Sequence, residues 1–146
     1  MSGPDAIDIL LVEDSDADAE LTVRALRKIR LESRLVRVRD GVAALDFIYR
    51  RGDYEERRGG QPKVILLDIK TPRLDGIDVL RSLKSDDETR TIPVVMLTSS
   101  REERDLRESY RLGVNSYLVK PLDSEGFAEV VSHAGRYWTA MNEIPI

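Results

Sequence analysis

Polar side chains that could do chemistry follow four apolar segments of this sequence, each at the point where the segment ends. They are Glu13 and Asp14, Asp68, Thr98, and Lys120. Carboxylates that lie close together repel one another and favour a bound cation, and oxygen ligands suit Mg²⁺. A lysine and a hydroxyl beside such a cation form an electrostatic clamp for a phosphoryl group. One carboxylate could itself be the nucleophile and form an aspartyl phosphate.

Asp68 is the best placed of these carboxylates. It follows the apolar run 64–67, whose lack of polar alternation is typical of a strand buried on both faces. A charged residue next to such a strand is expected at its carboxyl end, which is the edge where open parallel sheets bind ligands. The alternative is that Asp68 only caps the following turn. The other strand-end groups favour the ligand site.

The elements that must position these groups alternate along the chain. Strands are expected at 7–12, 35–39, 64–67, 94–97 and 116–119. Segment 35–39 alternates Leu and Val with Arg, so it is expected to be an edge strand with one face in water. Helical patterns are expected at about 16–29, 44–52, 77–83, 101–112 and 124–140, with Ser15 or Asp16 as the cap of the first helix and Gly113 as the end of the fourth. Five such alternations predict an α/β fold with a parallel sheet, right-handed crossovers and helices on both faces. The polar loop 53–63 is interpreted as a solvated connection, with partner recognition as the alternative.

Composition excludes several other classes of protein. The 146 residues suit one domain, and the absence of cysteine excludes disulfides, thiol catalysis and cysteine metal sites. A single histidine, His133, excludes a multi-histidine metal site. No apolar run approaches a membrane span and no signal segment is present, so a cytoplasmic protein is expected. The net charge of −4 argues against a nucleic-acid surface. There is no glycine-rich phosphate loop, so a nucleoside triphosphate is not the obvious donor.

Over residues 7–140 the chain resembles the receiver domain of two-component response regulators. The motifs that carry the resemblance are Leu11-Val12-Glu13-Asp14, Leu66-Leu67-Asp68, Pro72 with Asp75-Gly76, Leu97-Thr98-Ser99, and Tyr117-Leu118-Val119-Lys120-Pro121. The resemblance implies a flavodoxin-like, doubly wound five-stranded parallel sheet in the order 2-1-3-4-5. It divides the chain into a lead-in (1–6), a receiver domain (7–140) and a tail (141–146).

The resemblance also implies roles for the strand-end residues. A partner histidine kinase would phosphorylate Asp68, and the protein would catalyse nothing beyond its own Mg²⁺-dependent phosphorylation and dephosphorylation. Asp14 and Asp68 would bind Mg²⁺ directly, with Glu13 acting mainly through water. The backbone carbonyl of Lys70 would complete the protein ligands. Its side chain would be free at the mouth of the site, where it either affects dephosphorylation or has no role.

Three further residues have roles that the resemblance implies. Thr98 and Tyr117 match the switch pair of the family. Lys120 matches the phosphate-binding lysine, and its bond to Pro121 is expected to be cis, which proline tolerates far better than other residues.

Within the family the chain is similar to single-domain regulators that serve bacterial phytochrome kinases. The supporting features are the charged loop 53–63 and the tail residues Tyr137-Trp138 and Ile144-Pro145. No second domain follows, so output is expected through protein contacts or phosphate relay. We expect a homodimer whose interface includes Tyr137, Trp138, Met141 and Ile144, because large apolar side chains would otherwise stay in water. The alternative is a tail that folds back on its own domain.

Three rival functions remain open from the sequence. A receiver-like interaction module that takes no phosphate would not need the intact acid, hydroxyl and lysine set. A hydrolase with an aspartyl intermediate would be expected to carry a substrate-cap insertion. A flavin-binding electron carrier shares the expected topology but has no use for the acid cluster. His133 could be read as a phosphorelay donor, but a lone histidine on a terminal helix is more often at a surface or interface.

Overall fold

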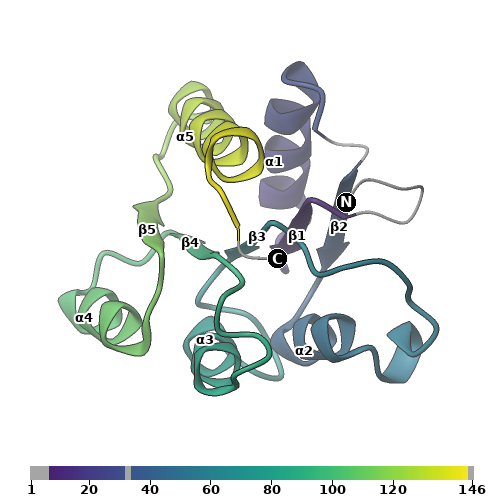
Figure 1. Cartoon of the computed structure of the whole chain (residues 1–146). Helices are drawn as coiled ribbons and strands as arrows, with labels where there is room; N and C mark the ends of the chain where they lie inside the picture. The colour runs from purple at the N-terminus through teal and green to yellow at the C-terminus, as the bar shows by residue number, and fades with distance from the viewer. Residues whose placement is uncertain (1–6, 32–33, 145–146) are drawn as a thin grey trace.

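The apolar segments of the sequence form the strands of one sheet. The computed structural model describes residues 7–31 and 34–144. Within that part, all strand pairs are parallel and the order is β2-β1-β3-β4-β5, as predicted (Figure 1). The strands are β1 (Ile9–Val12), β2 (Leu35–Val38), β3 (Val64–Leu67), β4 (Val94–Thr98) and β5 (Ser116–Val119).

Burial explains why β1 and β3 are uniformly apolar and why β4 is apolar up to its last residue, Thr98. Every residue of β1, β3 and β4 is buried, whereas β2 is mostly half-buried at the sheet edge, as predicted from its alternating pattern. The predicted bounds need small corrections. Strand β1 begins at Ile9 rather than Ile7, β2 ends at Val38, and β4 continues through Thr98.

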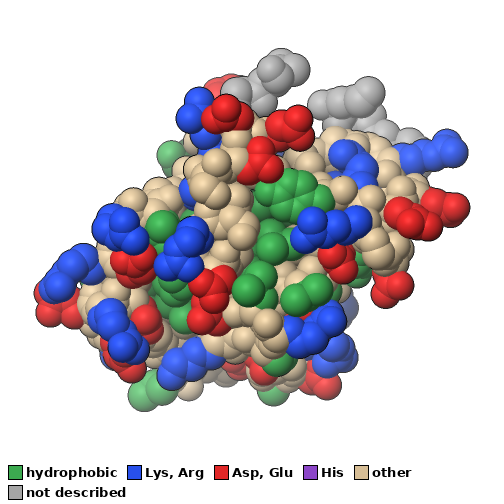
Figure 2. Space-filling view, turned by 90° about the horizontal axis from the view of Figure 1, so that it is seen from below, with side chains coloured by type: hydrophobic (Ala, Val, Ile, Leu, Met, Phe, Trp, Pro, Cys, Tyr) green, Lys and Arg blue, Asp and Glu red, His purple; other side chains and the backbone are tan. Residues whose placement is uncertain are grey.

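Helices cover both faces of the sheet. They are α1 (Asp16–Lys28), α2 (Gly41–Tyr49), α3 (Gly76–Ser85), α4 (Glu103–Leu112) and α5 (Ser124–Arg136). Helices α1 and α5 lie on one face, and α2, α3 and α4 lie on the other (Figure 1). Each face has its own core cluster, and β1, β3 and β4 contribute alternate residues to both. Figure 2 views the α2–α3–α4 face, where basic and acidic side chains alternate around hydrophobic ones.

Local sequence signals set the helix ends. The Ser15 hydroxyl accepts from the backbone N–H of Asp18 and caps α1 as predicted, while Asp40 caps α2 through the N–H of Ala43. Helix α4 ends at Gly113, also as predicted, and its φ of 102° is a conformation that glycine adopts readily.

Gly76 fixes the start of α3 against the end of β3. A Cβ placed on Gly76 would lie 2.3 Å from the backbone carbonyl oxygen of Asp68, a distance that real Cβ atoms do not show. The Gly76 N–H donates to the carbonyl of Ile69 at 2.7 Å. A glycine is therefore required if helix and strand are to pack this closely beside Asp68.

The loop before β3 makes more contacts with the rest of the domain than a purely solvated connection would. It begins with the short 3₁₀ helix η2 (Gly52–Tyr54), and the Tyr54 ring packs edge-on to Phe47 at 5.2 Å. The Arg57 guanidinium lies 4.2 Å from the Phe47 ring centroid and donates to the Phe47 carbonyl at 2.9 Å. Most other residues of the loop are exposed. The loop is therefore a solvated connection that contacts α2 through Tyr54, Arg57 and Gln61.

The C-terminal segment differs from the prediction. Helix α5 buries Phe127, Val131 and Ala134, but it ends at Arg136 rather than near residue 140, and the chain continues as the π-helical turn η3 (Tyr137–Met141). Trp138, predicted to be free for a partner subunit, packs against the core cluster under α1 and α5. The reason is its large apolar ring, which this turn brings back onto the domain.

Other parts of the tail stay open to water. The Lys63 ammonium donates to the backbone carbonyl of Thr139 at 3.2 Å and ties η3 to the start of β3. Tyr137 is 47% exposed and Met141 is 67% exposed, and Ile144 is half-buried. The tail therefore folds back through Trp138 and leaves Tyr137 and Met141 uncovered.

Two further observations concern the whole described chain. Every peptide bond within residues 7–31 and 34–144 is trans, so the predicted cis bond between Lys120 and Pro121 is wrong for this structure. Because an X–Pro bond prefers trans by only about 0.5–1 kcal/mol, the residue types alone do not decide the isomer. Among the described helices, none has the length and apolar character needed to span a bilayer.

Candidate functional site

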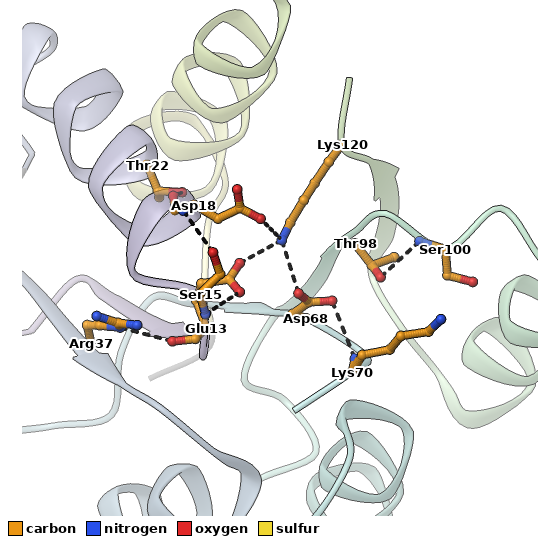
Figure 3. Close-up of polar contacts among 10 residues, drawn as sticks. All are labelled: Glu13, Ser15, Asp18, Thr22, Arg37, Asp68, Lys70, Thr98, Ser100 and Lys120. Carbon is orange, nitrogen blue, oxygen red and sulfur yellow. Dashed lines mark hydrogen bonds and ion pairs between the residues drawn. The ribbon is translucent and has the colours of Figure 1, made fainter. Parts of the chain in front are cut away.

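The predicted site residues meet at the carboxyl edge of the sheet (Figure 3). Parallel pairing brings them together, since the Asp68 N–H donates to the carbonyl of Val12 at 3.2 Å and the Lys120 N–H donates to that of Thr98 at 2.8 Å. The residue after β1, Glu13, therefore lies beside the residue after β3, and the end of β4 lies beside the residue after β5. The carboxyl-edge location inferred from the sequence is confirmed.

Lys120 lies at the centre of the site. Its ammonium is 2.6 Å from Glu13 Oε1, 2.9 Å from Asp18 Oδ2 and 3.0 Å from Asp68 Oδ2. A lysine ammonium has three hydrogens, so each can be donated to a different carboxylate. The side chains of Lys120, Glu13 and Asp68 are all at most 10% exposed. Water screens these charges weakly, and the contacts are correspondingly strong.

Burial and charge pairing act in opposite directions on two of these groups. Burial raises the pKa of the Glu13 carboxyl above its ordinary value, although the hydrogen bond from Lys120 opposes the shift. Burial alone would lower the pKa of Lys120. The contacts with Glu13, Asp18 and Asp68 outweigh burial and raise the pKa of Lys120 well above its ordinary value. The lysine is therefore a permanent cation at neutral pH.

Three carboxylates of the site can face one metal ion. Glu13, Asp14 and Asp68 each offer an oxygen, and these oxygens lie within 4.8 Å of one another. Asp14 is exposed, whereas Glu13 and Asp68 are buried. An all-oxygen set that is partly open to water fits a hard divalent cation, which keeps several water ligands.

Lys70 faces the site through its backbone. Its N–H donates to Asp68 Oδ1 at 3.4 Å, and its exposed side chain extends away from the Asp68 carboxylate towards the side where Thr98 and Ser100 lie (Figure 3). The predicted position of that side chain at the site mouth agrees with this exposure. The metal-ligand role of its carbonyl stays a prediction.

Thr98 and Tyr117 are linked through one residue that the sequence analysis did not single out. The buried Thr98 hydroxyl accepts from the Ser100 N–H at 3.2 Å, and the Tyr117 hydroxyl donates to the Ser100 carbonyl at 3.1 Å. The Ser100 hydroxyl donates to Asp105 of α4 at 2.6 Å. Burial raises the pKa of the Tyr117 hydroxyl, which keeps it a donor. A change at Thr98 can therefore reach Tyr117 and α4 through Ser100.

The sequence analysis also missed Asp18 and Arg37. Asp18 lies in the first turn of α1, and helix starts lie at the same sheet edge as strand ends, so its position offered a signal. Arg37 was expected only on the wet face of the edge strand. Its guanidinium donates to the Glu13 carbonyl at 2.9 Å and pairs with Asp16 at 2.8 Å, which anchors the acidic turn after β1.

Comparison with known proteins agrees with this geometry. Residues 9–132 match the response regulator receiver domain family. Response regulator Rcp1 from Synechocystis is 38% identical over 137 residues, which cover 94% of this chain and 92% of Rcp1. The Mn²⁺-bound crystal structure of Rcp1 superposes with a TM-score of 0.88 at 37% identity, covering 96% of this chain and 99% of that one.

Two other similar solved structures are named as phytochrome response regulators. The phosphorylated cyanobacterial phytochrome response regulator RcpA has a TM-score of 0.89 at 35% identity and covers 97% of this chain and 99% of its own. The bacteriophytochrome response regulator AtBRR has a TM-score of 0.75 at 49% identity and covers 94% of this chain and 99% of its own. Rcp1 is therefore found both by sequence and by structure.

Proposed function

The chain belongs to the response regulator receiver domain family and is homologous to phytochrome response regulators, and from this premise we propose that Asp68 accepts a phosphoryl group from a histidine kinase. One observation carries the proposal. Asp68 is a buried carboxylate at a strand end, with a permanently charged ammonium 3.0 Å from its Oδ2 atom. A capping role for Asp68 would require neither the burial nor the lysine.

The transfer step uses groups that the site already holds in place. A carboxylate oxygen of Asp68 attacks the phosphorus of the kinase's phosphohistidine, a P–O bond forms, and the P–N bond breaks. The electron pair of that bond goes to the imidazole nitrogen. Lys120 stabilises the negative charge on the phosphoryl oxygens, and the Thr98 hydroxyl is the donor on the opposite side.

Glu13, Asp14 and Asp68 would hold the divalent cation that the step requires, and we propose that it is Mg²⁺. The cation supplies charge neutralisation for the transferred group when it is bound. The carbonyl of Lys70, two residues after Asp68, would complete the protein ligands. Glu13 would act mainly through water, since its carboxylate is already engaged by Lys120 at 2.6 Å.

Ser100 would transmit the effect of phosphorylation from the site to the rest of the domain. When the Thr98 hydroxyl turns to the phosphoryl group, it releases the N–H of Ser100 that it accepts in the unphosphorylated protein. Tyr117 and Asp105 both contact Ser100, so strand β5 and helix α4 would respond together. The partner that reads this change is a protein, in keeping with the family.

A homodimer is the proposed assembly. The support is the pair of uncovered apolar side chains, Tyr137 and Met141, at the end of α5. Trp138 and Ile144 would contribute only their exposed parts, because both are half-buried. Aromatic residues and methionine are enriched in interface cores, and a symmetric pair is the commonest arrangement. We also propose that the receiver domain ends at Ala140 and that the tail begins at Met141.

A small phosphodonor such as acetyl phosphate tests the proposed function. With Mg²⁺, the wild type should gain the mass of one phosphoryl group, and Asp68→Asn should gain none. Asp53→Asn, which neutralises an exposed aspartate of the η2 turn, should gain the group like the wild type. A wild type that takes no phosphate from acetyl phosphate or from a kinase would favour the rival interaction module.

A further inference from the structure

Asp18 contacts Lys120 but lies outside the set of residues that the proposed phosphoryl chemistry uses. Its Oδ2 atom is 2.9 Å from the ammonium, and its side chain is 36% exposed. The backbone of Asp18 is held on both sides, because its N–H donates to Ser15 and its carbonyl accepts from the Thr22 hydroxyl at 2.9 Å. The first turn of α1 therefore presents this carboxylate to Lys120 from a fixed position (Figure 3).

The ammonium and a divalent cation compete for the same oxygens. Glu13 and Asp68 contact Lys120, and both also belong to the trio of carboxylates whose oxygens lie within 4.8 Å of one another. Asp18 is not in that trio. A hydrogen that Lys120 donates to Asp18 is thus not donated to a carboxylate that the cation needs.

The surroundings of Lys120 are open on the side of Asp18. Asp18 and Lys120 both line a pocket of about 290 Å³ whose walls include Leu122 and Phe127. The fully exposed Leu122 leaves this pocket accessible to solvent. The ammonium can therefore lean towards Asp18 without a steric obstacle.

We infer that Asp18 is a positioning residue of the phosphoryl site, which takes up one of the three hydrogens of the Lys120 ammonium and so weakens the hold of the ammonium on Glu13 and Asp68, the carboxylates that the divalent cation needs. The inference rests on the proposed function, since it assumes that the same carboxylates hold the cation. Without the negative charge on Asp18, Lys120 pairs more closely with Glu13 and Asp68, and cation binding weakens.

Calorimetric titration with Mg²⁺ tests the inference in the absence of any phosphodonor. Asp18→Asn should weaken Mg²⁺ binding about two- to fivefold, the range that a partly exposed ion pair supports. Glu20→Gln is the matched control, because it makes the same charge change on the same helix and Glu20 pairs only with Arg24 in the described structure. The control should leave Mg²⁺ affinity at the wild-type value. Asp18→Glu keeps the charge and should restore affinity.

A second measurement follows the ammonium itself. In ¹⁵N NMR of the lysine side chains, Lys120 should give a signal that Lys120→Met removes and that Asp18→Asn shifts, while Glu20→Gln leaves it in place. Equal Mg²⁺ affinities for Asp18→Asn and Glu20→Gln, an unmoved Lys120 signal in Asp18→Asn, or a wild type that binds no Mg²⁺ would overturn the inference. A wild type that binds Mg²⁺ but takes no phosphate would instead count against the proposed function alone.

Discussion

Replacing Lys120 by methionine removes the one charge that balances three carboxylates. Methionine fills a similar volume, so the change tests charge more than packing. In the wild type the ammonium contacts Glu13, Asp18 and Asp68 at 2.6–3.0 Å. Removing one partner of a buried ion pair costs about 3–5 kcal/mol. We expect about 3 kcal/mol of lost unfolding free energy at pH 7, because Asp18 is partly exposed and remains hydrated.

The destabilisation caused by Lys120→Met should become smaller as the pH falls. Burial already raises the pKa of Glu13 above its ordinary value, and the lysine opposes that shift. Without the lysine the folded variant binds a proton more readily than its unfolded chain does. Stability of the variant should therefore recover as pH falls towards the ordinary glutamate pKa of about 4.3.

A divalent cation should recover part of the same loss. Mg²⁺ would replace the missing positive charge, and a ligand at 100 times its dissociation constant stabilises the folded state by about 2.7 kcal/mol. Urea unfolding in EDTA and in Mg²⁺ measures both effects. Lys28→Met, which changes an exposed lysine of α1, is the control, and its free energy of unfolding should stay close to that of the wild type. A Lys120→Met protein as stable as the wild type in EDTA would refute the assignment of Lys120 as the balancing charge.

Three other predictions concern fold and assembly. Gly76→Ala should cost about 2–3 kcal/mol of unfolding free energy, because its Cβ would overlap a backbone oxygen, whereas Gly60→Ala, with nothing within 4 Å, should cost little. Asp40→Ala should cost about 1 kcal/mol at pH 7. Burial opposes the shift, but the capped N–H of Ala43 and the partner Arg73 lower the pKa of folded Asp40, so the cost should shrink as pH falls below about 3.9 and disappear only below the lower pKa of the folded state. Sedimentation should show a dimer that Met141→Lys disrupts and Leu122→Lys, on an exposed loop, does not; a monomeric wild type would contradict the dimer.

The strand-end chemistry was predictable from sequence for a physical reason. A fully buried strand tolerates no charge inside it, so the first polar residue marks its end, and parallel strands end at one edge. This argument placed Asp68 correctly, whereas Lys120 follows the half-buried strand β5 and was placed by the end of its apolar run alone. Gly113 and Ser15 marked helix ends through conformational and hydrogen-bonding preferences that act locally.

Features that depend on how elements pack were not predictable in the same way. Asp18 meets Lys120 only because the first turn of α1 lies at the carboxyl edge of the sheet, a relation between residues 102 positions apart. Trp138 folds back because a π-helical turn redirects the chain after Arg136, and the helical pattern of the sequence contains no sign of it. Ser100 is linked to the site by a hydrogen bond that its carbonyl accepts from Tyr117 on the next strand, β5.

Identification of the phosphorylated residue tests the central claim most directly. The protein would be phosphorylated by a partner histidine kinase with Mg²⁺ and then reduced with borohydride, which converts an aspartyl phosphate to homoserine. Peptide mass spectrometry would then locate the change. We expect homoserine in place of Asp68 and at no other acidic position. Homoserine at another carboxylate, or an unreduced peptide spanning Asp68 in protein that carries phosphate, would contradict the account.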